Sequence, residues 1–135
     1  MGGEDRDKSG SCLCNAVRYR VTGPMRPVIG CHCVQCRKQT GHYMAATSVP
    51  IKSFQLVEQR GLQWYRASDE ARRGFCNICG STLFWQRDGA DRISIAAGSL
   101  DGETGLSTAC HIFVDNKADY YDLDKDLPQH PAGDS

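Results

Sequence analysis

The sequence predicts an all-β domain whose short strands are held together by bound metal ions. Three observations lead to this prediction. Short segments that alternate apolar and polar residues recur along the 135-residue chain, with glycine or proline between them. No segment carries the 3.6-residue apolar repeat of an amphipathic helix. Eight cysteines are present, and seven of them lie within three residues of another cysteine.

The expected strands follow one another from residue 16 onward. Residues 16–21 alternate apolar and polar side chains, and the Gly-Pro pair at 23–24 ends this strand. Further short strands are expected at residues 44–49, 54–57, 62–65, 81–86, 92–97 and 111–114, while residues 28–30 lead directly into the cysteines at 31–36. Within 81–86, Leu83 and Trp85 are expected to share one face, and Trp64 and Trp85 to lie in the core. The domain is expected over residues 10–128, with a disordered tail at 1–9 and a polar tail at 129–135.

Size, charge and hydropathy restrict the classes of function. A chain of 135 residues corresponds to one domain. Lys plus Arg is 16 and Asp plus Glu is 16, which disfavours a nucleic-acid-binding protein, because such proteins usually carry a basic excess. No apolar run approaches the roughly 20 residues of a spanning helix, so no membrane partner is expected. The first ten residues lack the apolar segment of a secretory signal, which predicts a cytoplasmic location.

The cysteine spacing favours metal ligands over disulfides. Disulfides are rare in the reducing cytosol, and cysteines so close together strain the geometry of a disulfide bridge. Thiolates one or two residues apart can instead converge on one tetrahedral ion from a single turn. Tetrahedral sulfur ligation suits zinc and also iron.

The seven clustered cysteines divide most economically into a set of three and a set of four. Cys31, Cys33 and Cys36 lie within six residues and can share one ion. The remaining two pairs can form one closed site of Cys12, Cys14, Cys76 and Cys79. Four protein ligands are typical of a structural zinc site, and three with an open position of a catalytic one. Alternatively, a fourth ligand closes the second site, and the candidates are Cys110, His32, His42 and His111.

Five separated motifs occur in an order that resembles a known family. They are Gly-Ser-Cys-Leu-Cys-Asn-Ala-Val-Arg-Tyr at 10–19, Cys-His-Cys-Val-Gln-Cys-Arg at 31–37, Arg-Gly-Phe-Cys-Asn-Ile-Cys-Gly-Ser at 73–81, Gly-Ser-Leu-Asp at 98–101, and the segment from His-Ile-Phe-Val at 111–114 to Leu-Pro at 127–128. In this order they resemble the glutathione-dependent formaldehyde-activating (GFA) family, which is related to the centromere protein V domain. The resemblance covers about residues 10–128.

The resemblance implies a mainly antiparallel β fold like that of the Rab-exchange accessory chaperone family. It also implies a structural zinc on Cys12, Cys14, Cys76 and Cys79, and a catalytic zinc on Cys31, Cys33 and Cys36. The activity implied is that of a carbon–sulfur lyase, in which glutathione and formaldehyde combine to S-hydroxymethylglutathione. The implied partners are therefore a small thiol and a small aldehyde. A non-catalytic zinc-binding interaction domain of the same fold is the alternative.

The residues around the three-cysteine motif suggest how such an enzyme would work. A thiol bound at an open zinc position would lose its proton and attack the aldehyde carbon. His32 is the first candidate to carry a proton to the aldehyde oxygen and His42 the second, although His32 could instead simply face solvent. The carboxylates of a glutathione-like substrate could meet Arg37, Lys38 and Arg73. Taken singly, these three are ordinary solvated charges, and residues 69–73 look like a charge-compensated surface turn.

Overall fold

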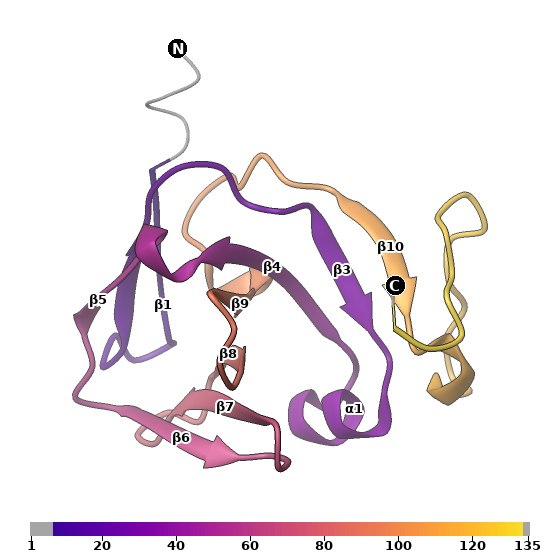
Figure 1. The fold of residues 1–135 in the computed structure, drawn as a ribbon, viewed down its shortest axis with the longest axis horizontal. Helices are drawn as coiled ribbons and strands as arrows, with labels where there is room; N and C mark the ends of the chain where they lie inside the picture. The colour runs from indigo at the N-terminus through magenta and orange to yellow at the C-terminus, as the bar shows by residue number, and fades with distance from the viewer. Residues whose placement is uncertain (1–6, 134–135) are drawn as a thin grey trace.

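The protein folds into two β-sheets, seen in the computed structural model, which describes residues 7–133 (Figure 1). The small sheet is antiparallel and has the order β1 (Lys8–Ser11), β2 (Arg18–Val21), β5 (Phe54–Glu58). The large sheet has the order β10 (Thr108–Ile112), β3 (Val28–Cys31), β4 (Met44–Pro50), β9 (Arg92–Ala96), β8 (Thr82–Arg87), β7 (Ala71–Cys76), β6 (Leu62–Arg66). Within it β10 and β3 are parallel, and the other neighbours are antiparallel. The prediction of an all-β, mainly antiparallel fold is confirmed.

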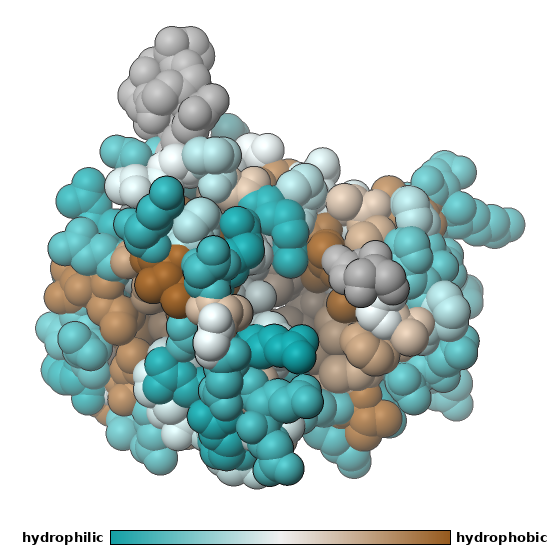
Figure 2. Space-filling model, viewed as in Figure 1, coloured by the Kyte–Doolittle hydropathy of each residue, from teal (hydrophilic) through white to brown (hydrophobic). Residues whose placement is uncertain are grey.

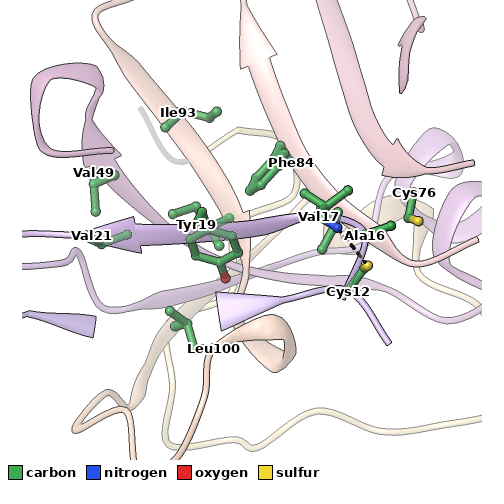
Figure 3. Close-up of a cluster of buried hydrophobic side chains, with 12 residues drawn as sticks. Cys12, Ala16, Val17, Tyr19, Val21, Val49, Cys76, Phe84, Ile93 and Leu100 are labelled. Atoms are coloured by element: carbon green, nitrogen blue, oxygen red, sulfur yellow. Dashed lines mark hydrogen bonds between the residues drawn. The ribbon is translucent and has the colours of Figure 1, made fainter. Parts of the chain in front are cut away.

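The hydrophobic core joins the small sheet to the large one. Tyr19 of β2 is buried against Phe84 of β8, with ring centroids 5.4 Å apart in an edge-to-face arrangement. Such contacts between aromatic rings add to the stability that burial of their apolar area provides. Figure 3 shows this cluster with Cys12 and Cys76 at one end, beside Ala16 and Val17. Two cysteines of the four-cysteine set therefore belong to the core itself.

A short helix, α1 (Val34–Thr40), was not expected from the sequence. Cys33 is its N-cap residue, because its sulfur accepts a hydrogen bond from the Cys36 backbone N–H at 3.3 Å. Gly41 ends the helix in the left-handed region at φ 85°. Seven residues are too few to display a clear apolar repeat, which explains why the pattern did not reveal the helix. In Figure 1 α1 lies between β3 and β7.

Strand β8 contains an irregularity that changes which side chains reach the core. Gly74 of β7 pairs with Phe84, but Phe75 pairs with Thr82, so Leu83 is an extra residue in β8. Leu83 and Phe84 are consequently both buried, whereas Trp85 is only half-buried. The expectation that Leu83 and Trp85 share one buried face is wrong, because a β-bulge shifts the alternation by one residue.

The strand boundaries differ from expectation near both ends of the domain. β1 begins at Lys8, inside the range 1–9 expected to be a disordered tail, and the rest of that range up to residue 6 lies outside the described residues. β10 ends at Ile112, because Phe113 adopts a left-handed conformation with φ 57°. Beyond residue 128, His130 exchanges backbone hydrogen bonds with His111 and Val114. The segment expected as a polar tail thus lies along the edge of the large sheet.

The face of the molecule seen in Figure 2 is largely hydrophilic, with hydrophobic side chains in separate groups. Among residues 7–133, no helix has the length and hydropathy needed to cross a membrane.

Candidate metal centres and the adjoining cavity

The four-cysteine cluster joins two turns that are far apart in the sequence. Cys12 and Cys14 follow β1, while Cys76 ends β7 and Cys79 lies in the next turn. Their sulfur atoms all lie within 4.8 Å of one another, with Cys14 Sγ 3.8 Å from Cys12 and 3.7 Å from Cys76. Gly80 completes the second turn with a φ of 83°, a conformation that glycine adopts without strain.

Uncharged groups donate to the sulfurs of this cluster. The Val17 backbone N–H donates to Cys12 Sγ at 3.2 Å, as the dashed line in Figure 3 marks. Cys76 Sγ accepts from the backbone N–H groups of Ile78 and Cys79 at 3.4 and 3.5 Å. The Ser81 hydroxyl, 3.1 Å from Cys79 Sγ, lowers the pKa of that thiol to about 5.

The three-cysteine cluster forms where β3 turns into α1. Cys31 is the last residue of β3, Cys33 is the helix cap and Cys36 lies in the first turn of α1. Their three sulfur atoms also lie within 4.8 Å of one another. Hydrogen bonds from Cys31 and Cys36 lower the pKa of Cys33 far below its ordinary range, so a thiolate is favoured at this position.

Arg73 lies against this cluster and is almost completely buried, with 2% of its surface exposed. Its Nη2 donates to Cys36 Sγ at 3.2 Å and its Nε donates to the side-chain oxygen of Gln35 at 2.8 Å. The expectation that Arg73 belongs to a solvated surface turn is wrong. Residues 71–76 form an interior strand of the large sheet, and its register turns Arg73 toward α1 while Arg72 contacts Trp64 and Gln86.

A cavity of about 500 Å³ adjoins the three-cysteine cluster. All three cysteines and Arg73 line it. Its apolar lining consists of Ile29, Met44, Ala46, Ala71, Trp85, Ile112 and Phe113, and its other polar lining of Arg26, Gln35, Ser68, Glu70, Arg87 and Ser94. A small molecule that entered this cavity would therefore meet three sulfur atoms, charged side chains of both signs and a set of apolar side chains.

Residues His32, Arg37 and Lys38, also expected at the site, do not line this cavity. His32 is fully buried rather than facing solvent, and its Nδ1 lies 2.5 Å from the Tyr121 hydroxyl and its Nε2 2.9 Å from His111 Nδ1. Burial lowers the pKa of His32 to about 4, with a smaller contribution from His111. Lys38 is exposed on α1.

The cysteine spacing left open that a fourth ligand closes the three-cysteine site. Among residues 7–133 the structure gives no support for such a ligand. Within that part of the chain, the group that could hold a metal at this site consists of Cys31, Cys33 and Cys36 alone. Both ring nitrogens of His32 are engaged elsewhere, and His42 Nδ1 lies 2.6 Å from the Tyr120 hydroxyl. Cys110 lies in β10 opposite Ile29 and outside both clusters.

Sequence reasoning missed Gln35 and Trp85 as residues of the site. Gln35 lies inside the Cys-x-Cys-x-x-Cys motif and could have been considered as a partner for a nearby cation. Trp85 could not have been found, because the β-bulge that turns it toward the cavity leaves no signal in the alternation of residues 81–86.

The fold and the site together define a β-rich protein with two cysteine clusters, of four and three residues, that can each hold a metal ion. Residues 7–116 match the protein family described as "Glutathione-dependent formaldehyde-activating enzyme" (GFA). The chain belongs to the GFA family, as its motifs indicated.

Two relatives and one solved structure extend this comparison. A Schizosaccharomyces pombe protein named as an uncharacterized lyase is 29% identical over 115 residues, which cover 84% of this chain and 83% of that protein. A Halomonas elongata protein with the name "Putative glutathione-dependent formaldehyde-activating enzyme" is 29% identical over 126 residues, covering 85% of this chain and 80% of the relative. A crystal structure of a Rhodobacter sphaeroides protein matches with a TM-score of 0.59 at 22% identity, over 74% of this chain and 97% of that one, which supports the fold.

Proposed function

We propose that the protein is a zinc-dependent carbon–sulfur lyase that joins a glutathione-like thiol to formaldehyde or another small aldehyde and catalyses the reverse reaction. One observation carries this proposal. Three cysteine sulfurs lie within 4.8 Å of one another on the wall of a cavity of about 500 Å³. Three protein ligands beside a cavity are typical of a catalytic zinc site, whereas four are typical of a structural one.

The donor atoms fit zinc at both clusters. Soft thiolate ligands in a tetrahedral arrangement favour zinc among the common divalent ions. A zinc ion held by Cys31, Cys33 and Cys36 would lower the pKa of a substrate thiol that bound to it. We assign Cys12, Cys14, Cys76 and Cys79 to the structural ion and Cys31, Cys33 and Cys36 to the catalytic one.

The residues of the chain position the reactants in the cavity. In the forward reaction, a bond forms between the thiol sulfur and the aldehyde carbon, and the proton lost by sulfur ends on the aldehyde oxygen. Arg73 Nη1 is buried without a hydrogen-bond partner among the described residues and can donate to an oxygen placed beside Cys36. Among the expected substrate-binding residues, we therefore assign this role to Arg73 and not to Arg37 or Lys38, which lie away from the cavity.

We assign His32 a positioning role in place of proton transfer. It lies between two cysteine ligands, and its hydrogen bonds to Tyr121 and His111 connect the turn after β3 to the C-terminal part of the chain. The proposed reaction takes place in the cytoplasm, where thiols stay reduced.

The proposal is tested by following ¹³C-formaldehyde and a panel of thiols by NMR exchange spectroscopy. We expect the zinc-loaded protein to raise the rate of hydroxymethyl-thiol formation above the uncatalysed rate for at least one thiol. Cys33→Ala should abolish this increase, whereas Cys110→Ala, outside both clusters, should retain it. A zinc-loaded protein without any increase for glutathione, cysteine and 2-mercaptoethanol would instead support the non-catalytic interaction domain.

A further inference from the structure

We propose that Arg73 is a positioning residue that balances the charge of the three-cysteine site and thereby sets its affinity for metal. This inference depends on the metal-binding part of the proposed function and not on the reaction. It rests on the burial of Arg73, on the atoms that its guanidinium contacts, and on the difference between the two cysteine clusters.

The burial of Arg73 requires a negatively charged partner. Only 2% of its surface is exposed, and transferring an unpaired charge into the interior is costly. Within the described residues an ion pair joins Arg66 to Asp88 at the surface, but no carboxylate pairs with Arg73. The group that its guanidinium contacts at the cluster is the Cys36 sulfur, at 3.2 Å, which is a thiolate when it acts as a metal ligand.

The contacts of the guanidinium also fix its orientation. Nε and Nη2 form one edge of the planar group, and both donate to neighbouring residues of α1, Gln35 and Cys36. A charge-assisted hydrogen bond to a thiolate is stronger than one from a neutral amide. Gln35 thus holds Arg73 in the plane from which Nη2 reaches the Cys36 sulfur.

The charge of the loaded site explains why a cation is needed here. Three thiolates and one divalent ion leave one negative charge, which a single guanidinium balances. Cys31 and Cys33 are half-buried, but Cys36 is buried with 5% of its surface exposed, and it is this sulfur that the guanidinium contacts. At the other cluster Cys12 and Cys76 are buried and Cys14 is exposed, and the donors that contact its sulfurs are backbone amides and a hydroxyl, which carry no net charge. Groups around a metal site that hold its ligands typically change metal affinity by about 10–100-fold.

The test is a chelator competition on the zinc-loaded protein, which needs neither thiol nor aldehyde substrate. Zinc release to a chromogenic chelator is followed for the unaltered chain, Arg73→Gln and Arg73→Lys. We expect Arg73→Gln to weaken the affinity for the ion at the three-cysteine cluster by about 10–100-fold, so that one of the two ions is released more readily. The affinity for the ion at the four-cysteine cluster should be unchanged. Arg73→Lys keeps the charge but not the fork geometry, so an intermediate loss is expected.

Arg72→Gln is the matched control, because Arg72 precedes Arg73 in β7 and contacts Trp64 and Gln86 instead of a cysteine. It should release both ions like the unaltered chain. Equal retention of both ions in Arg73→Gln and Arg72→Gln would overturn the inference. If Arg73→Gln does not fold, Gln35→Ala decides the question, since it keeps the cation and removes the acceptor that orients it. We expect a loss of several-fold from Gln35→Ala at the same ion, and unchanged affinity would contradict the proposal.

Discussion

The two cysteine clusters use the same ligand atom, yet the chain assembles them in different ways. The four-cysteine cluster joins residues 12 and 14 to residues 76 and 79, and Cys12 and Cys76 are part of the hydrophobic core. The three-cysteine cluster lies within six residues, borders a cavity and is contacted by the buried cation Arg73. The comparison suggests that the first cluster maintains the fold, while the second is surrounded by groups that can act on a small molecule.

The largest expected effect distinguishes the clusters by their contribution to stability. Cys76→Ala removes a ligand that is also a fully buried core residue, so we expect a loss of about 4 kcal/mol or more in the free energy of unfolding. Cys33→Ala should cost much less, because this half-buried residue lies outside the main core. Urea denaturation of the zinc-loaded proteins measures both values. Equal losses would contradict the division of roles.

A smaller loss of stability is expected when a methyl group is added next to the four-cysteine cluster, at Gly61. A Cβ added at Gly61 would lie 2.8 Å from Cys76 Sγ and 2.8 Å from Ala16 Cβ. Gly61→Ala should therefore cost about 1–3 kcal/mol and weaken zinc binding at this cluster. Gly98→Ala is the control, since no atom lies within 4 Å of its added Cβ. Thermal unfolding and zinc release of the two variants test this prediction, which fails if they behave alike.

Trp85 tests whether the cavity beside the three-cysteine cluster binds the substrate. Trp85→Ala removes a large apolar side chain from the cavity wall without removing a buried core residue. We expect about a tenfold lower kcat/KM for the thiol that gives the highest rate, with both zinc ions retained. Trp64→Phe, which alters the other tryptophan of the chain on the core side, should leave this ratio nearly unchanged. An unchanged kcat/KM in Trp85→Ala would place the substrate elsewhere.

The smallest expected effect is on how the melting temperature changes with pH. It concerns His111, whose backbone forms hydrogen bonds with Pro128 and His130 near the C-terminus. Burial lowers the pKa of His111 below its ordinary value of 6.5, so the folded state favours the neutral ring. The unfolded chain then binds more protons just below pH 6.5, and this contribution to stability, present above that pH, is lost as pH falls. In His111→Gln the decrease in melting temperature between pH 7.5 and 5.5 should be smaller than in the unaltered chain. Identical decreases would contradict this role of His111.

Much of the fold could be predicted, because each strand shows the alternation of apolar and polar residues within its own short sequence. Residues 16–21 alternate cleanly, and the structure places Tyr19 and Val21 of β2 in the core as expected. The spacing also predicted that the cysteines gather in a cluster of four and a cluster of three, as the structure has them, because thiols one or two residues apart converge readily.

What could not be predicted depends on register or on distant contacts. Arg73 appears in a run of charged residues, and only its place in an interior strand buries it beside Cys36. The orientation of Trp85 depends on an extra residue in β8, which alternation cannot reveal. His32 is buried because His111 and Tyr121, which lie 79 and 89 residues further along the chain, cover it.

The separation of the cysteines along the chain also implies an order of events during folding. The three-cysteine segment can close around an ion while the rest of the chain is still unfolded, because loop closure over six residues costs little entropy. The four-cysteine site closes a loop from residue 14 to residue 76 and needs β1, β2 and β7 in place. Since Cys33 also caps α1, the first ion to bind would nucleate the helix, and the second would lock the completed sheets.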